Sequence, residues 1–232
     1  MKPSHQLLLI LSFTLLASLS LAKPRQQPPD TRTSPEKWDA DIASLEARFA
    51  SRSSTTARIV FVGSSTIRRW KLDAAFPGLD AVNHGFGGSF LSDSVHFFDR
   101  IVKPASPEII VLYAGDNDLN AGKSPEIVVR DFQAFLDKVD QSLPNCRKIL
   151  FLSIKPSIKR WKNRDNIVRT NQLIQALCNQ HPRADFVDLW QISLDSSGMP
   201  RRDLLDTDDL HLSDAGYELW TRTLTPLLLL PE

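Results

Sequence analysis

The sequence predicts a single α/β domain built on a parallel β-sheet. Short apolar runs recur along the chain, and stretches with helical spacing separate them. Near-continuous apolar strands indicate a sheet that is covered on both faces, and their alternation with helices indicates parallel strands joined by crossovers. The chain has 232 residues, of which 42% are hydrophobic, so it can bury one sizeable core.

The first 22 residues have the pattern of a secretory signal peptide. Their only charged residue is Lys2, followed by an apolar stretch from Leu7 to Leu16 and an end at Ser20-Leu21-Ala22 that suits a cleavage site. An uncleaved anchor is the alternative, but the stretch is short for a span of about 20 apolar residues. We therefore expect export to the periplasm or the medium, with no stable membrane span after cleavage.

The elements after the signal segment follow in regular order. Residues 23–35 are rich in Pro, Gln and Thr and are expected to form a flexible leader, which leaves residues 36–232 for the folded domain. Strands are expected at Arg58–Gly63, Ala81–Asn83, Glu108–Tyr113, Lys148–Ile154 and Asp185–Leu189. Helices are expected at Glu36–Ser51, Thr66–Ala75, Ser89–Val102, Pro125–Leu143, Arg164–His181 and Asp214–Leu229.

Charge and cysteine content exclude several classes of function. Without Lys2, 27 of the 28 basic residues remain against 27 acidic residues. This balance argues against nucleic acid as a partner, because phosphate binding needs a positive surplus. Cys146 and Cys178 belong to no CxxC pair, which gives no support for a zinc site. They form either a disulfide, as export would permit, or two buried thiols.

Polar residues stand where three of the expected strands end. The segment "IVFVGSSTIRRW", Ile59 to Trp70, passes from an apolar run through Gly-Ser-Ser into a helical stretch. The second strand leads into Asn83–Gly88, and the third leads into Gly115–Asp118. Ligands of open parallel sheets bind at the carboxyl ends of the strands, so we expect these loops to converge. Ser65 is there either as a helix cap or as a nucleophile.

A serine nucleophile needs a base and a group that orients the base. Of the five histidines, His211 has the most suitable surroundings, because Asp208 precedes it by three residues in "DTDDLHLSDAGY" and a helix follows. A carboxylate at that distance can accept a hydrogen bond from the imidazole and hold its tautomer. His84, in the second loop, is a weaker candidate.

The four motifs together resemble the SGNH (GDSL-like) hydrolase family. Gly-x-Ser, Asn-x-Gly-x-x-Gly, Gly-x-Asn-Asp and Asp-x-x-His occur in that order over nearly the whole expected domain. The resemblance implies a flavodoxin-like three-layer α/β/α sandwich with a five-stranded parallel sheet. It also implies a serine ester hydrolase that works through an acyl-enzyme, without a metal or organic cofactor.

The resemblance implies specific roles. Ser65 would be the nucleophile, His211 the general base and then acid, and Asp208 the residue that orients His211. The backbone N–H groups of Ser65 and Gly88 and the side-chain amide of Asn117 would form the oxyanion hole, where the spacing favours Gly88 over Gly87. This chain has Ser64 where the family usually has Asp, a departure that bears on local hydrogen bonding.

Substrate choice depends on the surroundings of these motifs. The motif loops are short and contain no obvious apolar lid, which favours a short acyl group. Trp161, in the basic loop after the fourth strand, is expected to line the substrate approach. The prediction is a short-chain carboxylic esterase, with carbohydrate O-acetyl esters ahead of lysophospholipids. A lipase-type acylhydrolase and an inactive binding protein of the same fold are the alternatives, and the sequence does not indicate an oligomeric state.

Overall fold

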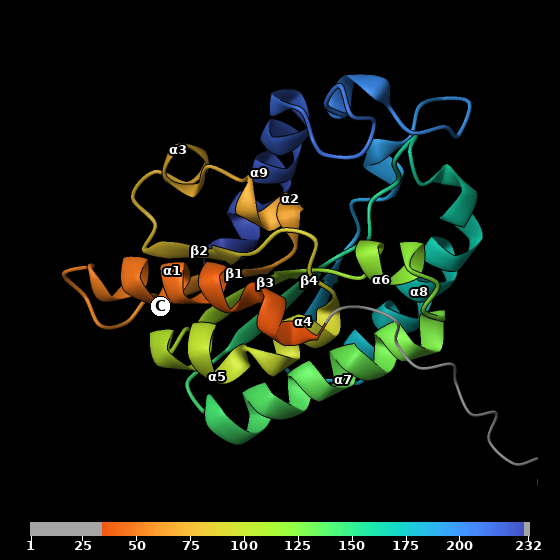
Figure 1. The fold of residues 1–232 in the computed structure, drawn as a ribbon. Helices are drawn as coiled ribbons and strands as arrows, with labels where there is room; N and C mark the ends of the chain where they lie inside the picture. Colours follow the sequence, from red (N-terminus) through yellow and green to blue (C-terminus); the bar gives the residue numbers. More distant parts are fainter. Residues whose placement is uncertain (1–33, 230–232) are drawn as a thin grey trace, which may run out of the picture. The chain divides into compact units, whose positions relative to one another are not determined.

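The computed structural model describes residues 34–229 (Figure 1). The predicted signal segment and residues 23–33 of the predicted leader lie outside the described residues. No helix in the described range is long and apolar enough to cross a membrane.

A parallel sheet of five strands forms the middle layer of residues 34–229. Its order is β2-β1-β3-β4-β5. The first strand is therefore internal, the second lies at one edge, and the remaining three follow in sequence toward the other edge. Every pairing between neighbouring strands is parallel. The strands are β1 (Ile59–Gly63), β2 (Ala81–Gly85), β3 (Ile109–Tyr113), β4 (Lys148–Leu152) and β5 (Ala184–Val187).

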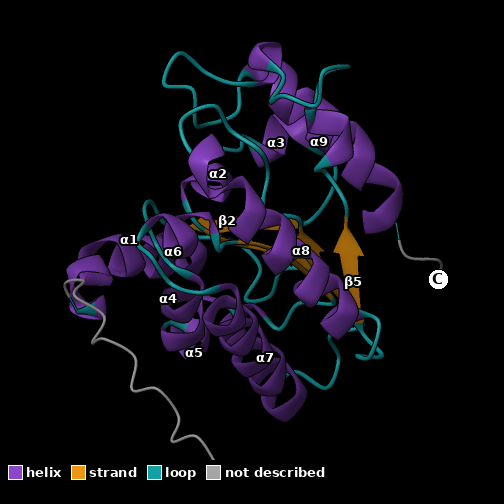
Figure 2. Cartoon of the chain, turned by 90° about the vertical axis from the view of Figure 1, so that its right-hand side faces the viewer, coloured by secondary structure: helices purple, strands orange, loops and turns teal. Residues whose placement is uncertain are grey.

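Helices cover both faces of the sheet (Figures 1 and 2). One face carries α1 (Asp39–Ala50), α4 (Leu91–His96), α5 (Phe98–Ile101), α7 (Pro125–Ser142) and α8 (Arg164–Cys178). The other face carries α2 (Ser65–Arg68), α3 (Leu72–Ala75) and α9 (Asp214–Leu228). The short helix α6 (Asp116–Asn120) follows β3. This arrangement confirms the predicted three-layer fold.

The alternation of side chains along each strand explains the two cores. Val60 and Val62 of β1 pack in the same core as Phe132 of α7, on the face covered by α1, α4, α5, α7 and α8. Ile59 and Phe61 pack on the opposite face, with α2, α3 and α9. All residues of β1 and β3 are buried, as expected for strands covered on both faces.

Two predicted helices are interrupted. The stretch Thr66–Ala75 forms α2 and α3, because Asn83 Nδ2 donates to Ile67 O at 2.7 Å and to Trp70 O at 2.9 Å and so satisfies carbonyl groups at the end of α2. The stretch Ser89–Val102 is likewise divided into α4 and α5 at Phe97, whose ψ of 6° departs from helical geometry.

Strand ends also differ from the prediction. The second strand continues through His84 to Gly85, two residues beyond the predicted end. The fourth strand stops at Leu152, because the N–H and C=O of Ile154 are bonded to the side-chain amide of Asn171 rather than to another strand. The fifth strand begins one residue before the predicted start, at Ala184, and ends two residues before the predicted end, at Val187.

Both cysteines are free in the structure. Cys146, just before β4, and Cys178, at the end of α8, are buried thiols. Burial raises the pKa of Cys146 to about 11 and that of Cys178 to about 12. The open question of a disulfide is therefore answered in favour of two buried thiols in this structure.

Candidate active site

The turn after β1 explains why the strand ends in Gly-Ser-Ser. Gly63 has a φ of 136°, and a Cβ there would lie 2.0 Å from the carbonyl oxygen of Tyr113 on β3. Only glycine allows this approach. Ser64 occupies the N-cap position of α2 without a side-chain capping bond, and its N–H donates to Tyr113 O at 3.0 Å. Ser65 opens α2, and its hydroxyl is left for another partner.

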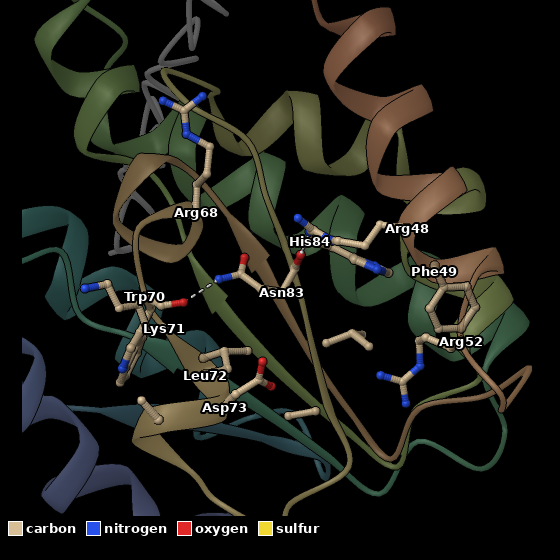
Figure 3. Close-up of a pocket in the computed structure, with 13 residues that line it drawn as sticks. Arg48, Phe49, Arg52, Arg68, Trp70, Lys71, Leu72, Asp73, Asn83 and His84 are labelled. Carbon is tan, nitrogen blue, oxygen red and sulfur yellow. Dashed lines mark hydrogen bonds between the residues drawn. The ribbon is translucent and has the colours of Figure 1, made fainter.

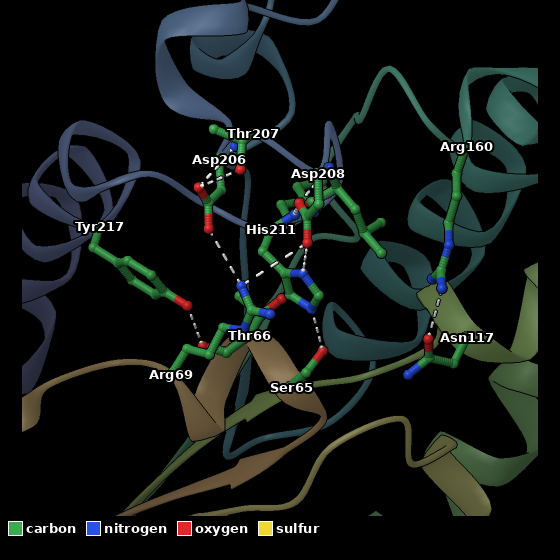
Figure 4. Close-up of polar contacts among 12 residues, drawn as sticks. Ser65, Thr66, Arg69, Asn117, Arg160, Asp206, Thr207, Asp208, His211 and Tyr217 are labelled. Carbon is green, nitrogen blue, oxygen red and sulfur yellow. Dashed lines mark hydrogen bonds and ion pairs between the residues drawn. The ribbon is translucent and has the colours of Figure 1, made fainter.

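That partner is His211. Ser65 Oγ lies 2.8 Å from His211 Nε2, and His211 Nδ1 lies 2.5 Å from Asp208 Oδ2. An ionised carboxylate can only accept, so Nδ1 carries the imidazole proton and Nε2 is free to accept from the serine hydroxyl. Figure 4 shows the three side chains in a row, with Asp208 at one end and Ser65 at the other. The structure thus brings together three residues that the sequence motifs singled out.

Asp208 performs two tasks with its two oxygens. Oδ1 accepts from the backbone N–H groups of Leu210 at 3.0 Å and His211 at 2.9 Å, while Oδ2 holds the imidazole. Partial burial opposes ionisation, but the hydrogen bonds from His211 and these backbone groups outweigh it and lower the pKa of Asp208 well below its usual value. The carboxylate is therefore charged near neutral pH.

The pKa of His211 is lowered, which keeps the ring neutral. Burial is the largest cause, and the positive charges of Arg69 and Lys155 add to it, against the opposing effect of Asp208. Arg69 lies 3.9 Å from Asp208 Oδ2 and 3.4 Å from Asp206. A neutral imidazole is the form that can accept a proton from a serine.

Lys155 supports the loop that carries His211. Its side chain is fully buried, and Nζ donates to the carbonyl oxygen of Leu210, the residue before His211. Burial lowers the pKa of Lys155, and the negative charge of Asp116 opposes that shift.

Asn117 lies at the start of α6 with its amide held at both ends. Nδ2 donates to the carbonyl oxygen of Ser89 at 2.9 Å, and Oδ1 accepts from Arg160 at 2.9 Å. The same guanidinium contacts Asp116 at 2.9 Å, and both side chains of that ion pair are largely buried. One hydrogen of the Asn117 amide remains available after these contacts, and donation to Oδ1 polarises the amide toward the N–H side.

Asp118 joins α6 to the loop after β2. The carboxylate accepts from the N–H of Leu91 and from Lys123 Nζ, which also contacts Asp131 at 3.0 Å. Burial raises the pKa of Asp118 to about 6 against the effect of Lys123. Asp116 and Asp118 thus organise the loop, while Asn117 between them faces the site.

A pocket of about 260 Å³ opens at Ser65 and His211. Gly87, Gly88 and Asn117 line it from the proposed oxyanion side. Arg68, Arg69, Arg160 and Leu210 complete the described lining. Gly88 has a φ of 74°, which suits a glycine, but both glycines border the pocket, so the choice of Gly88 as donor stays a prediction.

Trp161 does not line this pocket. Its ring stacks on Trp190, with centroids 6.0 Å apart and an interplanar angle of 13°, and Arg164 lies over it. The residue of this loop that reaches the pocket is Arg160. That Trp161 lines the substrate approach stays a prediction.

Sequence reasoning missed three supporting contacts. The sequence indicates a basic loop after the fourth strand, but it does not indicate that Arg160 of this loop contacts Asn117. Lys155 and Ser89 gave no signal, because a lysine after a strand and a serine after glycines usually lie at the surface or in a turn.

The arrangement suits attack by a serine hydroxyl on a carbonyl carbon. It supplies a nucleophile, a neutral base, a charged orienting group and amide hydrogens beside one small pocket. Across residues 34–229 we find no group of three or more His, Cys, Asp or Glu side chains placed to hold a metal ion.

Comparison with known proteins agrees with this geometry. The model of the GDSL-like lipase/acylhydrolase family matches residues 36–219. Platelet-activating factor acetylhydrolase IB subunit alpha1 of Bos taurus is 31% identical over 207 residues, which cover 82% of this chain and 84% of that protein.

Two solved structures share the fold. A Streptococcus pneumonia protein, described as a candidate platelet activating factor, is 24% identical with a TM-score of 0.75 and covers 84% of this chain and 94% of its own. An acetyl-xylooligosaccharide esterase variant of Geobacillus Stearmophilus is 14% identical with a TM-score of 0.58 and covers 77% and 96%. With the family match extending over most of its length, the chain belongs to the GDSL-like lipase/acylhydrolase family of ester hydrolases.

Proposed function

We propose that this protein is an exported esterase that removes short acyl groups through a Ser65 acyl-enzyme. The observation that carries the proposal is the hydrogen-bond chain from Ser65 through His211 to Asp208, which opens onto a pocket bordered by Gly88 and Asn117. An intact chain of this kind also argues against the alternative of an inactive binding protein.

The mechanism follows from the contacts. His211 Nε2 takes the proton of Ser65 Oγ as the oxygen attacks the ester carbonyl, and Asp208 stabilises the imidazolium that forms. The developing oxyanion receives hydrogen bonds from the Ser65 and Gly88 N–H groups and from Asn117 Nδ2. His211 then protonates the leaving alcohol, and water repeats the sequence on the acyl-enzyme.

The size and lining of the pocket support a short acyl group. At about 260 Å³ it is smaller than most ligand pockets, and Leu210 is the only aliphatic side chain among its described lining residues. A long acyl chain would find little apolar surface to bury against. The names of the Bos taurus and Geobacillus Stearmophilus proteins, an acetylhydrolase and an acetyl-ester-cleaving enzyme, support the same size class. We place carbohydrate O-acetyl esters ahead of lysophospholipids.

Export is part of the proposal, and it rests on the pattern of residues 1–22. Detection of a chain beginning at Lys23 outside the cytoplasm tests it. Retention of the full chain in the membrane fraction would instead favour the uncleaved anchor.

Two measurements test the enzymatic proposal. A fluorophosphonate probe should label the wild type and should not label Ser65→Ala. Ser64→Ala is the control: the Ser64 hydroxyl makes no capping hydrogen bond to α2, so this variant should still be labelled. Nitrophenyl esters of increasing chain length, measured beside acetylated xylo-oligosaccharides and lysophospholipids, should show the highest rates for acetate. Rates that climb steadily toward long acyl chains, with no acetate released from sugars, would overturn the proposed substrate.

A further inference from the structure

A second and larger pocket lies beside the catalytic one. It has a volume of about 470 Å³ and lies between α1, the α2–α3 segment and the edge strand β2 (Figure 3). Arg68 belongs to the lining of both pockets, so the two share a wall. The guanidinium of Arg68 packs against Gly87, since a Cβ at that glycine would lie 2.6 Å from Arg68 Cζ.

The lining of this larger pocket is basic. Arg48 and Arg52 reach it from the side of α1, and Arg68 and Lys71 border it from the opposite side, as Figure 3 shows. Among the described residues of the lining, Asp73 is the only one with an acidic side chain. We call this cavity the basic pocket.

Three of these four cations have no ion-pair partner among the residues that the structure describes. Arg52 is paired with Asp80, but within residues 34–229 Arg48, Arg68 and Lys71 form no ion pair. Arg48 is nevertheless held in place, because its guanidinium donates to the carbonyl oxygen of Asn83 on β2.

The remaining groups of the basic pocket add no negative charge. Burial lowers the pKa of His84 to about 4, so its ring is neutral near pH 7. Trp70, Leu72 and Phe49 supply apolar surface between the cations. The result is a cavity with positive walls and a partly apolar lining, which suits an anion attached to a carbon framework.

We propose that the basic pocket is a subsite for a negatively charged group on the alcohol part of the ester, with Arg68 contacting that group beside the scissile bond. This inference rests on the proposed function, because it assigns the substrate class of the same site. The acyl group would occupy the small pocket at Ser65, and the leaving alcohol would extend past Arg68 with its phosphate, sulfate or carboxylate facing Arg48 and Lys71.

A matched pair of substrates tests the subsite. One is a nitrophenyl acetate with a carboxylate on the ring, and the other carries a neutral carboxamide at the same place. The ratio of their kcat/KM values should favour the anionic ester at low salt and fall as salt screens the charges. Arg68→Gln and Arg48→Gln should each lower this ratio about tenfold, as expected for the loss of one charge-assisted contact.

Arg222→Gln is the control, because Arg222 is exposed on α9 and paired with Glu218. It should leave the ratio unchanged. A ratio that is insensitive to salt and is the same in the wild type, Arg48→Gln and Arg68→Gln would overturn the subsite while leaving the esterase intact. Absence of Ser65-dependent hydrolysis of the neutral ester would instead overturn the proposed function.

Binding of inorganic phosphate provides a readout that does not depend on activity. Calorimetric titration of the Ser65→Ala protein should show phosphate binding, and the added substitutions Arg48→Gln and Arg68→Gln should weaken it at least about tenfold. Equal affinity with and without the two arginines, or no binding to either protein, would contradict the subsite.

Discussion

The acid–base half of the site and its oxyanion half are built in different ways. Asp208 and His211 lie three residues apart in one loop, and a single carboxylate fixes both the backbone of that loop and the imidazole ring. Gly88 lies in the loop after β2, and Asn117 lies at the start of α6, after β3; Asn117 depends on Ser89 and Arg160 for its orientation. Contacts within one loop therefore orient the base, with added support from Lys155, whereas contacts between distant segments orient Asn117.

This difference has a consequence for mutational effects. A change in the acid–base half should act on chemistry and leave the fold intact, because the loop keeps most of its own contacts. A change in the oxyanion half should also lower the stability of the fold, because each contact there joins elements that are distant in sequence.

The largest expected effect is that of Asp208→Asn. The amide oxygen can still accept from the N–H groups of Leu210 and His211, but Nδ2 in place of Oδ2 would donate and force His211 into the wrong tautomer. We expect kcat to fall by about 10⁴, as in the serine protease triad, with little change in Tm. A fall in Tm large enough to account for the lost activity would contradict the view that a change in the Asp208–His211 loop affects the chemistry and leaves the fold intact.

Asn117→Ala should have the next largest effect. Loss of one oxyanion donor raises the barrier by about 2.7–4 kcal/mol, or about 10²–10³ in kcat. Because the change also removes the acceptor of Arg160 and the contact with Ser89, a moderate fall in Tm should accompany it. Unchanged kcat on nitrophenyl acetate in a folded variant would remove Asn117 from the oxyanion hole.

Arg160→Met should lower kcat about tenfold, because the loss of a charge-assisted hydrogen bond leaves the Asn117 amide less polarised and less well oriented. A double-mutant cycle separates this positioning role from a general structural role. In an Asn117→Ala background, Arg160→Met should have almost no further effect on kcat, although it should still lower Tm because Asp116 loses its buried partner. Additive effects on kcat would show that Arg160 acts independently of Asn117.

The smallest effect concerns pH. The lowered pKa of His211 places the acidic limb of the kcat/KM profile at a lower pH than an ordinary histidine would give, because only the neutral ring accepts the serine proton. Burial is the main cause of that shift, but Arg69 contributes, so Arg69→Gln should move the limb to higher pH. Arg222→Gln serves as the control and should leave the limb in place. A limb that stays in place in Arg69→Gln, or moves to lower pH, would argue against an effect of this charge on His211.

The same contrast explains what could be predicted from the sequence. The short spacing of Asp208 and His211 identified them as a pair, and the order of the motifs placed Ser65 and Asn117 at the same edge of the sheet. Arg160 and Lys155 could not be assigned, because their roles depend on which backbone or amide group lies opposite them in the folded chain. The break between α2 and α3 was missed for the same reason, since it depends on Asn83 of a different strand.

The side chain of Asn83 also links an edge strand to the helix that carries the nucleophile. It bonds the end of α2 through Ile67 and Trp70 and the N–H of Gly85 through Oδ1, so the edge strand β2 and the helix that carries Ser65 are tied together. An edge strand is ordinarily the first part of a sheet to fray, because one of its sides has no neighbour. Here fraying would release the nucleophile as well. Native-state hydrogen exchange should therefore find β2 and α2 opening as one cooperative unit, and each such opening is an interval in which the enzyme cannot turn over.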